Sequence, residues 1–465
     1  MKHWKSVVLI ILILLLASSA CTPKPTPEAV AHGTNAPGDL ALLETKVAAT
    51  LTALAPVLPP RGEAPTQAVQ ETTRAVDPTE VAATPTAASP AAVIAYAKDG
   101  VVYLWSAGTS RPLTSPGSAV FNVLLSDDGS RVAYTRQVDD LRQEIWAVPT
   151  DGMDGTLLMS SADFAAIDME ALAVLPNQIG WVPGSHILAF NTHQVFEGPG
   201  ISPYDDLHLI DVDTFERRTP FLAGEGGDFY FSPDGAQVAF STPTRVDLVN
   251  LDGSNRRSAA LSFEMVLTFS EYMLYPPLVW AADSSSVWAA IPPHDAMAVP
   301  AQPTTVWSIP ADGSPAVKTS EFNVAPLLGF ELPISPDTQR VAYLAEIGAA
   351  PDTQLELHLR TLDGSTDETI HAAPFMDFLS WSPDGRQYAV NVGNEQALYI
   401  GTVGGGFAPA PGAPLGVSSL EWLDAEQYVY LQTGASGSSL AAGMLDSAPQ
   451  VIDTLAEGFI AYSVP

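Results

Sequence analysis

Short apolar runs separated by turn residues fill the chain from residue 91 to its end. Runs such as Gln237–Phe240 and Arg340–Tyr343 are rich in β-branched and aromatic side chains, and they end at Gly, Pro, Asp or Asn. This pattern is typical of short strands. No long stretch in this region repeats its apolar residues at the spacing of a helix. The roughly 375 residues from 91 to 465 therefore predict an all-β domain with a large core.

A recurring tetrapeptide, Ser-Pro-Asp-Gly, marks the boundaries between these runs. It stands at Ser232–Gly235 and Ser382–Gly385, with variants at Ser126–Gly129 and Ser335–Thr338. Proline presets φ at the second turn position, Asp can bond its own backbone, and Gly tolerates a left-handed exit. Each copy follows an apolar residue and precedes a strand-like run. The tetrapeptide therefore predicts a repeated tight turn between two strands of a hairpin.

Aligning the copies gives a unit of four antiparallel strands. Inner strands are expected at Val123–Leu125, Gln178–Trp181, Phe229–Phe231, Leu278–Trp280, Leu332–Ile334, Phe378–Trp381 and Leu420–Trp422. A second strand follows each turn, and a third strand leads to another Asp-Gly-like turn, such as Asp252-Gly253, before a fourth, outer strand. Successive inner turns lie 41 to 56 residues apart. This spacing predicts the blades of a β-propeller.

The two ends of the domain complete each other. Ile94–Ala97, Val101–Trp105 and Arg111–Thr114 supply three strands without an inner one, and Gly458–Pro465 is an inner strand with nothing after it. Their pairing would form one composite blade and remove an exposed sheet edge. Seven internal units and this blade favour eight blades. Seven blades is the alternative if the degenerate unit around Ala281–Ser286 is misread.

Units of this kind resemble the propeller repeats of the TolB family, which are WD40-like repeats marked by Ser-Pro-Asp-Gly before an Ala-Phe or Ala-Tyr strand. The resemblance covers residues 91–465, with good motifs in four units and degenerate ones in the others. It implies the propeller fold. It also implies protein or peptide partners in the cell envelope, without identifying them.

Residues 1–21 predict a segment that is removed or processed. A basic start is followed by the apolar run Val7–Leu16, which is too short to span a bilayer as a helix, and then by Ala20 and Cys21. The segment resembles a bacterial lipoprotein signal, although Ser18 stands where Leu is commonest. The resemblance implies lipid attachment at Cys21, the only cysteine, and a protein held on a bacterial membrane outside the cytoplasm.

Residues 22–90 are rich in Pro, Thr and Ala and predict a disordered linker between the anchor and the propeller. Within it, apolar residues spaced three and four apart predict a short helix at residues 39–54. An isolated helix is preferred to a coiled coil, so the propeller is expected to be monomeric.

Charge and motifs exclude several classes of function. The chain has 20 basic and 52 acidic residues, a formal net charge of −32, and only two lysines after residue 90. Nucleic acids need clustered basic residues, so they are disfavoured as partners. No Gly-x-Ser-x-Gly, His-Glu-x-x-His or calcium-loop spacing occurs. We therefore expect no catalysis, no cofactor and no metal.

The antiparallel order of a blade would place the short Asp-Gly turns at one end of the ring and the long, varied loops at the other. The varied end is the expected recognition surface. Its loops carry aromatic candidates for partner binding and an acidic rim that includes Asp139, Asp140 and Glu197. The candidate partner-binding residues are Phe196, Tyr204, Asp205, Asp206, Phe263, Phe269, Tyr272 and Tyr275.

Two hypotheses about function follow. The first is a membrane-anchored, extracytoplasmic propeller that binds a protein or peptide through its loop-rich end. The alternative is a secreted enzyme that processes polysaccharides or peptides at a site in the channel. Convergence of three or more His and carboxylate side chains, drawn from residues such as His193, His208, His294 and His358, would favour the enzyme.

Overall fold

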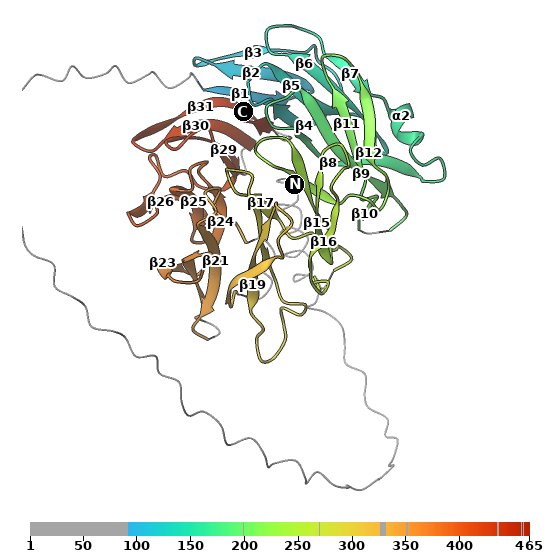
Figure 1. Ribbon diagram of the computed structural model, residues 1–465. Coiled ribbons are helices and arrows are strands. Elements are labelled where there is room, and N and C mark those ends of the chain that lie inside the picture. The colour runs from blue at the N-terminus through green and yellow to red at the C-terminus, as the bar shows by residue number, and fades with distance from the viewer. Residues whose placement is uncertain are drawn as a thin grey trace, which may run out of the picture. The chain divides into compact units, whose positions relative to one another are not determined.

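The computed structural model describes residues 92–465, apart from residues 199, 269, 326–331, 350–351, 435–436, 457 and 459. The predicted signal segment with Cys21, the linker with its expected helix at 39–54, and Phe269 lie outside these residues. The described chain forms eight antiparallel sheets that follow one another as the blades of a propeller (Figure 1). The expected all-β propeller fold is confirmed, with eight blades.

The first four blades use the N-terminal half of the domain. Blade 1 contains β1 (Val93–Lys98), β2 (Val101–Ser106), β3 (Thr109–Pro112) and the C-terminal β32 (Ala461–Ser463). Blade 2 contains β4 (Val120–Leu125), β5 (Arg131–Asp139), β6 (Arg142–Pro149) and β7 (Thr156–Met159). Blade 3 contains β8 (Ala173–Trp181), β9 (Ile187–Val195), the short β10 (Ser202–Pro203), β11 (Leu207–Asp211) and β12 (Arg217–Phe221). Blade 4 contains β13 (Asp228–Phe231), β14 (Gln237–Ser241), β15 (Arg245–Asn250) and β16 (Arg257–Ser262).

The other four blades use the C-terminal half. Blade 5 contains β17 (Leu278–Trp280), β18 (Ser286–Ile291), β19 (Thr304–Pro310) and β20 (Val317–Phe322). Blade 6 contains β21 (Arg340–Ile347), β22 (Gln354–Thr361) and β23 (Asp367–Ala373). Blade 7 contains β24 (Met376–Trp381), β25 (Gln387–Val392), β26 (Ala397–Thr402) and β27 (Phe407–Pro409). Blade 8 contains β28 (Val417–Trp422), β29 (Gln427–Gly434), β30 (Gly437–Met444) and β31 (Ser447–Leu455).

The two ends of the domain meet in blade 1, as the sequence predicts. Strand β32 pairs antiparallel with β1, with Tyr462 opposite Tyr96, and Figure 1 shows the C-terminus beside β1. Behind this pair, Tyr96 and Tyr462 share an apolar cluster with Val429 of blade 8. The ring of sheets is therefore closed, and β1 presents no unpaired edge toward the channel.

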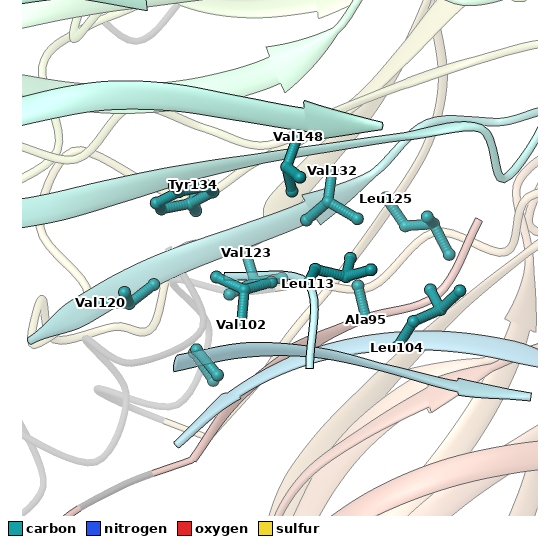
Figure 2. Close-up of a cluster of buried hydrophobic side chains, with 12 residues drawn as sticks. Ala95, Val102, Leu104, Leu113, Val120, Val123, Leu125, Val132, Tyr134 and Val148 are labelled. Atoms are coloured by element: carbon teal, nitrogen blue, oxygen red, sulfur yellow. The ribbon is translucent and has the colours of Figure 1, made fainter. Parts of the chain in front are cut away.

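Each neighbouring pair of blades shares one apolar cluster of buried side chains, and eight such clusters follow the ring through the described residues. Figure 2 shows the cluster between blades 1 and 2, where Val132 and Tyr134 of β5 face Val102 and Leu104 of β2. A fully buried Val or Leu contributes roughly 1.5–3 kcal/mol. Because a blade buries its faces only against its neighbours, the ring is stable as a whole rather than blade by blade.

The repeated tetrapeptide forms the turn after the inner strand, and its polar atoms bond to one another. In blade 4, the Ser232 hydroxyl donates to Asp234 at 2.6 Å and accepts from the Gln237 N–H at 2.9 Å. Asp234 also accepts from the Ala236 N–H at 3.0 Å, and Gly235 has a φ of +68°. The same bonds recur around Ser335 and Ser382. The motif is therefore a turn-forming device, as predicted.

Three details differ from the sequence expectations. The unit around Ala281–Ser286 is an ordinary hairpin between β17 and β18, so the seven-blade alternative is wrong. The inner strand of blade 6 is reduced to one described bridge, Ile334 to Val341. The chain has a short helix, α2 (Ser161–Ala165), closed by a capping box between Ser160 and Asp163; the sequence shows this box, but the run is too short to stand out.

Candidate functional site

The two ends of the propeller ring carry different kinds of connection. Because all strands within a blade pair antiparallel, the turns after the inner and third strands lie at one end, the turn face. The connections after the second and fourth strands lie at the other end, the loop face. They vary from residues 140–141 between β5 and β6 to residues 263–277 between β16 and β17. The expected contrast between a uniform and a varied face is confirmed.

Three loops of the loop face contact one another over blades 3 to 5. These are residues 196–206, 263–277 and 292–303, and we call them together the loop surface. The Tyr275 hydroxyl donates to Asp205 at 3.1 Å, which joins the first loop to the second. The second loop is joined to the third because the Leu267 N–H donates to the His294 carbonyl at 2.8 Å. The three loops therefore form one continuous surface.

The loop surface exposes an unusual set of side chains. Its exposed large apolar residues are Phe196, Met265, Leu267, Met273, Met297 and Val299. The three loops contain no Lys or Arg, and their acidic residues are Glu197, Asp205, Asp206, Glu264, Glu271 and Asp295. Contiguous exposed apolar side chains beside charged ones are typical of interaction sites. Methionine is common on surfaces that adapt to a partner because its side chain is flexible and polarisable.

The structure separates the predicted binding residues into exposed and internal ones. Phe196 is exposed on the loop surface, and Tyr272 and Tyr275 are half-buried in it. Phe263 packs against the core between blades 4 and 5. Tyr204 packs against the core between blades 2 and 3, and its hydroxyl donates to Asp168 at 2.6 Å. A role in partner binding stays a prediction for all of them.

Asp206 is an internal structural carboxylate. It accepts from the Thr192 N–H at 2.7 Å, from the Thr192 hydroxyl at 2.6 Å, and lies 2.9 Å from His208 Nε2. Burial acts to raise its pKa, but the bonds from His208 and Thr192 outweigh burial and leave the pKa below its usual value. Asp206 therefore joins β9 to β11 and offers little to a ligand.

Asp205 and Asp228 form the most unusual electrostatic feature of the loop face. Asp228 is the first residue of β13 and is 9% exposed. It lies opposite Ser241, whose hydroxyl donates to the carbonyl of Pro276, the neighbour of Tyr275, at 2.7 Å. Burial, with a further contribution from Asp205, raises the pKa of Asp228 to about 7. Burial also raises the pKa of Asp205, despite the bond from Tyr275.

Sequence reasoning missed Asp228. It directly precedes the aromatic run Phe229–Phe231, whose pattern predicts an inner strand whatever residue stands before it. The available signal was an acidic residue at the start of a strand whose other residues are buried against neighbouring blades. Its proximity to Asp205 and Tyr275 depends on how three blades pack together, which the sequence does not show.

A groove of about 390 Å³ lies beside α2, also on the loop face. The β5–β6 hairpin and the start of β8 form its walls, with the exposed Leu141 and Leu172 at its edge and the buried Phe164 at its base. The predicted rim acids Asp139 and Asp140 line it, and Asp139 is paired with Arg142. Asp139 and Asp140 thus lie at a tight hairpin turn between β5 and β6.

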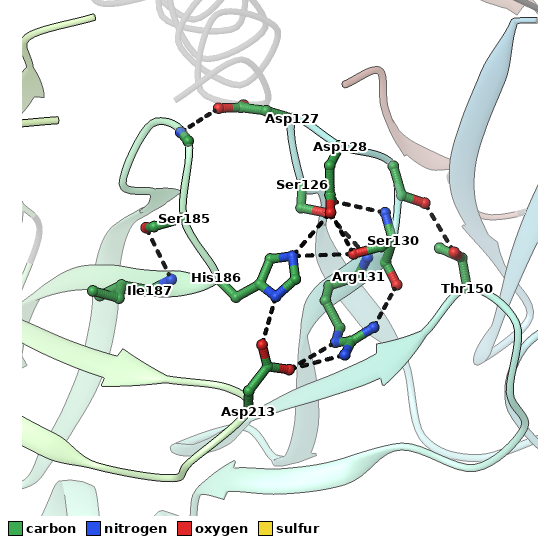
Figure 3. Close-up of polar contacts among 12 residues, drawn as sticks. Ser126, Asp127, Asp128, Ser130, Arg131, Thr150, Ser185, His186, Ile187 and Asp213 are labelled. Carbon is green, nitrogen blue, oxygen red and sulfur yellow. Dashed lines mark hydrogen bonds and ion pairs between the residues drawn. The ribbon is translucent and has the colours of Figure 1, made fainter. Parts of the chain in front are cut away.

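A second polar cluster lies on the turn face, at the junction of blades 2 and 3 (Figure 3). His186 Nδ1 is 2.6 Å from Asp213, and His186 Nε2 is 3.1 Å from Asp128. Arg131 also donates to Asp213, at 2.9 Å. The bond to Asp213 is the main reason that the pKa of His186 is raised. Carboxylate oxygens face both ring nitrogens of His186, an arrangement that favours the protonated imidazole and ties the two blades together.

This cluster contains the distances of a Ser-His-Asp triad. The Ser130 hydroxyl oxygen lies 3.0 Å from His186 Nε2, on the side opposite Asp213. However, the Ser130 hydroxyl donates to Asp128 at 2.8 Å. His186 Nε2 also faces Asp128, so the serine hydroxyl and this ring nitrogen are both directed at the same carboxylate rather than at each other. The geometry favours a structural ion network.

The histidines named for the enzyme hypothesis do not converge. His208 contacts Asp206 in blade 3, His358 contacts Asp367 in blade 6, and His294 contacts the Met265 carbonyl on the loop surface. His193 lies in β9 of blade 3, and burial lowers its pKa. Within residues 92–465 as described, no three His, Cys, Asp or Glu side chains are placed to hold a metal ion. Nor does any helix in the described part of the chain have the length and apolarity to cross a membrane.

Comparisons with known proteins identify similar folds. No protein-family model matches the chain, and no curated protein matches it. A eukaryotic initiation factor is similar in structure, with a TM-score of 0.49, 11% identity, and coverage of 80% of this chain and 98% of that chain. Oligogalacturonate lyase from Vibrio parahaemolyticus has a TM-score of 0.43 and 13% identity, with coverage of 65% of this chain and 83% of that chain. TolB from Acinetobacter baumannii has a TM-score of 0.36 and 13% identity, with coverage of 80% of this chain and 81% of that chain. The likeness is one of fold.

Proposed function

We propose that the protein is a membrane-anchored, extracytoplasmic propeller that binds a protein or peptide partner through the loop surface and catalyses no reaction. The supporting observation is the gathering of exposed apolar side chains, among them Phe196, Met265 and Met297, on three loops that contact one another. Exposed apolar surface costs solubility, so a protein gains from a contiguous patch of it mainly through binding. Phe196 and the methionines supply apolar contact, and the surrounding carboxylates select a partner by charge.

The anchor rests on the sequence before the propeller. The apolar run Val7–Leu16 ends shortly before Cys21, and residues 22–90 separate this cysteine from the first blade. Lipid on Cys21 would hold the propeller at a membrane surface. Replacement of Cys21 by Ser should move the protein from the membrane fraction to the soluble fraction and remove the mass of the lipid. Retention in the membrane fraction with unchanged mass would contradict the anchor.

Affinity capture from membrane extract tests the binding function. The bait is the chain from residue 22 onward, and its variant carries Met265→Ser, Met273→Ser and Met297→Ser. Because these side chains are exposed and support no core, the variant should fold normally yet lose most of the captured partner. The measurement is the amount of each captured species by mass spectrometry.

The control is Met153→Ser, which removes a methionine that is 65% exposed beside the Asp151-Gly152 turn of the turn face. It should capture as the parent does. Equal capture by the triple variant and the parent would contradict the assignment of the loop surface.

An enzyme remains the alternative, and Asp228 is the observation that favours it. A carboxyl group with a pKa of about 7 beside a second carboxyl group is the usual acid–base equipment of enzymes that cleave polysaccharides. Hydrolysis of a polysaccharide panel that disappears in Asp228→Asn would support an enzyme. Hydrolysis absent from the parent chain would leave binding as the function.

A further inference from the structure

The groove beside α2 lies along a strand edge that is left unpaired. Strand β7 pairs with β6 only over Ile145–Ala147, and it ends at Met159, where the chain turns into α2. Farther along β6, toward its start, no strand among the described residues pairs with it on this side. Gln143 of β6, Ser161 of α2 and Ala173 of β8 all line the groove. The groove therefore occupies the side of β6 that a longer β7 would cover.

The main chain of Gln143 points toward this open side. Gln143 lies opposite Gln137 of β5, and the Gln137 N–H donates to the Ala119 carbonyl at 2.9 Å, away from β6. Two residues that are opposite in an antiparallel pair turn their N–H and C=O groups either toward each other or both away. The N–H and C=O of Gln143 therefore face away from β5, where no described strand receives them. An edge of this kind can pair with an added strand.

The groove offers apolar contact next to this edge. Its base contains the buried Phe164 and Val174, and its rim carries Leu141 and Leu172, which are 39% and 56% exposed. The still more exposed Met169 lies in the segment between α2 and β8. A volume of about 390 Å³ with mainly apolar walls and a few polar groups is typical of binding sites.

The charges around the groove favour a basic occupant. Arg142 is the only basic residue among the described residues that line it, and it pairs with Asp139 at 2.5 Å. Asp140 also lines the groove, and Glu170 lies two residues before Leu172 on the rim. Both of these carboxylates are exposed and form no ion pair within the described part of the chain. A positively charged segment therefore complements the groove.

We propose that the groove binds an extended segment of the partner, which adds a strand to β6 at Gln143 and places basic side chains near Asp140 and Glu170. Apolar side chains of the same segment fill the groove. This inference rests on the proposed function and adds the chemistry and conformation of what the partner presents. The groove adjoins the loop surface, because Tyr204 of that surface donates its hydroxyl to Asp168, between α2 and β8, at 2.6 Å. One partner can therefore contact both.

The test uses acetyl-Lys-Leu-Val-Leu-Lys-amide as the probe, with two analogues. One analogue has Glu in place of both Lys residues, and the other has N-methyl groups on the three central residues, which removes the donors of an added strand. Binding to the chain from residue 22 onward is measured by fluorescence anisotropy of the labelled peptides. The parent should bind the probe at least about tenfold more tightly than either analogue. The probe should also slow amide hydrogen exchange in residues 140–147.

Two groove variants and one control locate the site. The variant with Leu141→Ser and Leu172→Ser should bind the probe at least about tenfold more weakly, because the two leucines lose the contact that burial would give them. The control, Leu222→Ser, removes a leucine that is 63% exposed directly after β12 and should bind as the parent does. The variant with Asp140→Lys and Glu170→Lys should prefer the Glu analogue to the probe, a reversal that misfolding does not produce.

Several results would overturn the inference. These are no binding of the probe, equal binding of the N-methyl analogue, or unchanged affinity in both groove variants. A parent chain that sediments as a dimer and dissociates when Leu141 and Leu172 are replaced would mean that the groove holds a second copy of the chain, which also overturns it.

The capture experiment separates this inference from the proposed function. If capture depends on Met265, Met273 and Met297 but the probe fails, the loop surface stands and the groove inference is wrong. If the probe binds as expected but capture is unchanged in the triple methionine variant, the groove site exists and the loop surface is wrong.

Discussion

The turn face and the loop face use aspartate in opposite ways. On the turn face, Asp234 accepts bonds from the Ser232 hydroxyl and the Ala236 N–H, and the bond from Ser232 is the main cause of its lowered pKa. On the loop face, the Asp228 carboxyl group is buried and makes no side-chain hydrogen bond to another described residue, and its pKa is raised to about 7. The fold favours the ionised form of Asp234 and disfavours the ionised form of Asp228.

The difference teaches where stability and function separate in this fold. The turn-face residues satisfy their own polar groups locally, so the motif can repeat in several blades without a ligand. At Asp205 and Asp228, by contrast, burial disfavours the ionised carboxyl groups. Arrangements that lower stability in this way tend to persist where they serve binding or catalysis. The contrast therefore supports the proposal that the loop face binds the partner, and experiments can test it.

The largest expected effect is on the pH dependence of stability, through Asp228. Between pH 3.8, its pKa when unfolded, and about 7, its pKa when folded, the unfolded chain loses this proton while the folded protein keeps it. Stability therefore falls as pH rises through this window, and a pKa change from 3.8 to about 7 corresponds to about 4 kcal/mol. Asp228→Asn should remove this loss and be more stable than the parent at pH 8, measured by urea unfolding.

The control is Asp234→Asn, which makes the same chemical change on the turn face. Its carboxylate is favoured in the folded state, so this variant should lose stability rather than gain it at pH 8. If both variants are destabilised equally at pH 8, the two aspartates do not differ as the comparison requires.

The same contrast marks what the sequence could predict. The turn face follows from local chemistry, because Ser382, Asp384 and Gly385 bond within one turn. The repeat of this turn along the sequence marks the blades, so the strand order, the closure of the ring and the varied loop face could be predicted. The loop-face site could be predicted only in part. Asp205 and Tyr275 were both named, but their contact spans 70 residues of sequence, and Asp228 resembled the edge of a strand. Contacts between blades depend on the packing of three sheets, which no local pattern encodes.

A smaller effect is expected from the turn motif itself. Ser382 is fully buried, donates to Asp384 at 2.7 Å and accepts from the Gln387 N–H at 2.8 Å. Ser382→Ala leaves that N–H without a partner, which should cost about 1–3 kcal/mol at neutral pH in urea unfolding. Capture of the partner should be unchanged once folding is restored at low temperature. Loss of capture by the folded variant would show that the two faces are not independent.

The smallest effect is expected from the ion network between blades 2 and 3. Its His186 has a pKa raised chiefly by the bond to Asp213, so the network's contribution is full below pH 6.5 and is lost as pH rises through the raised pKa. Because these side chains are partly exposed, the contribution should be only about 0.2–1 kcal/mol. His186→Gln should therefore lower the urea midpoint at pH 5.5 and match the parent at pH 9. If the variant's urea midpoint is lowered equally at pH 9, packing rather than charge joins these blades. The turn face would then not stabilise its charged groups in the way that the comparison with Asp228 requires.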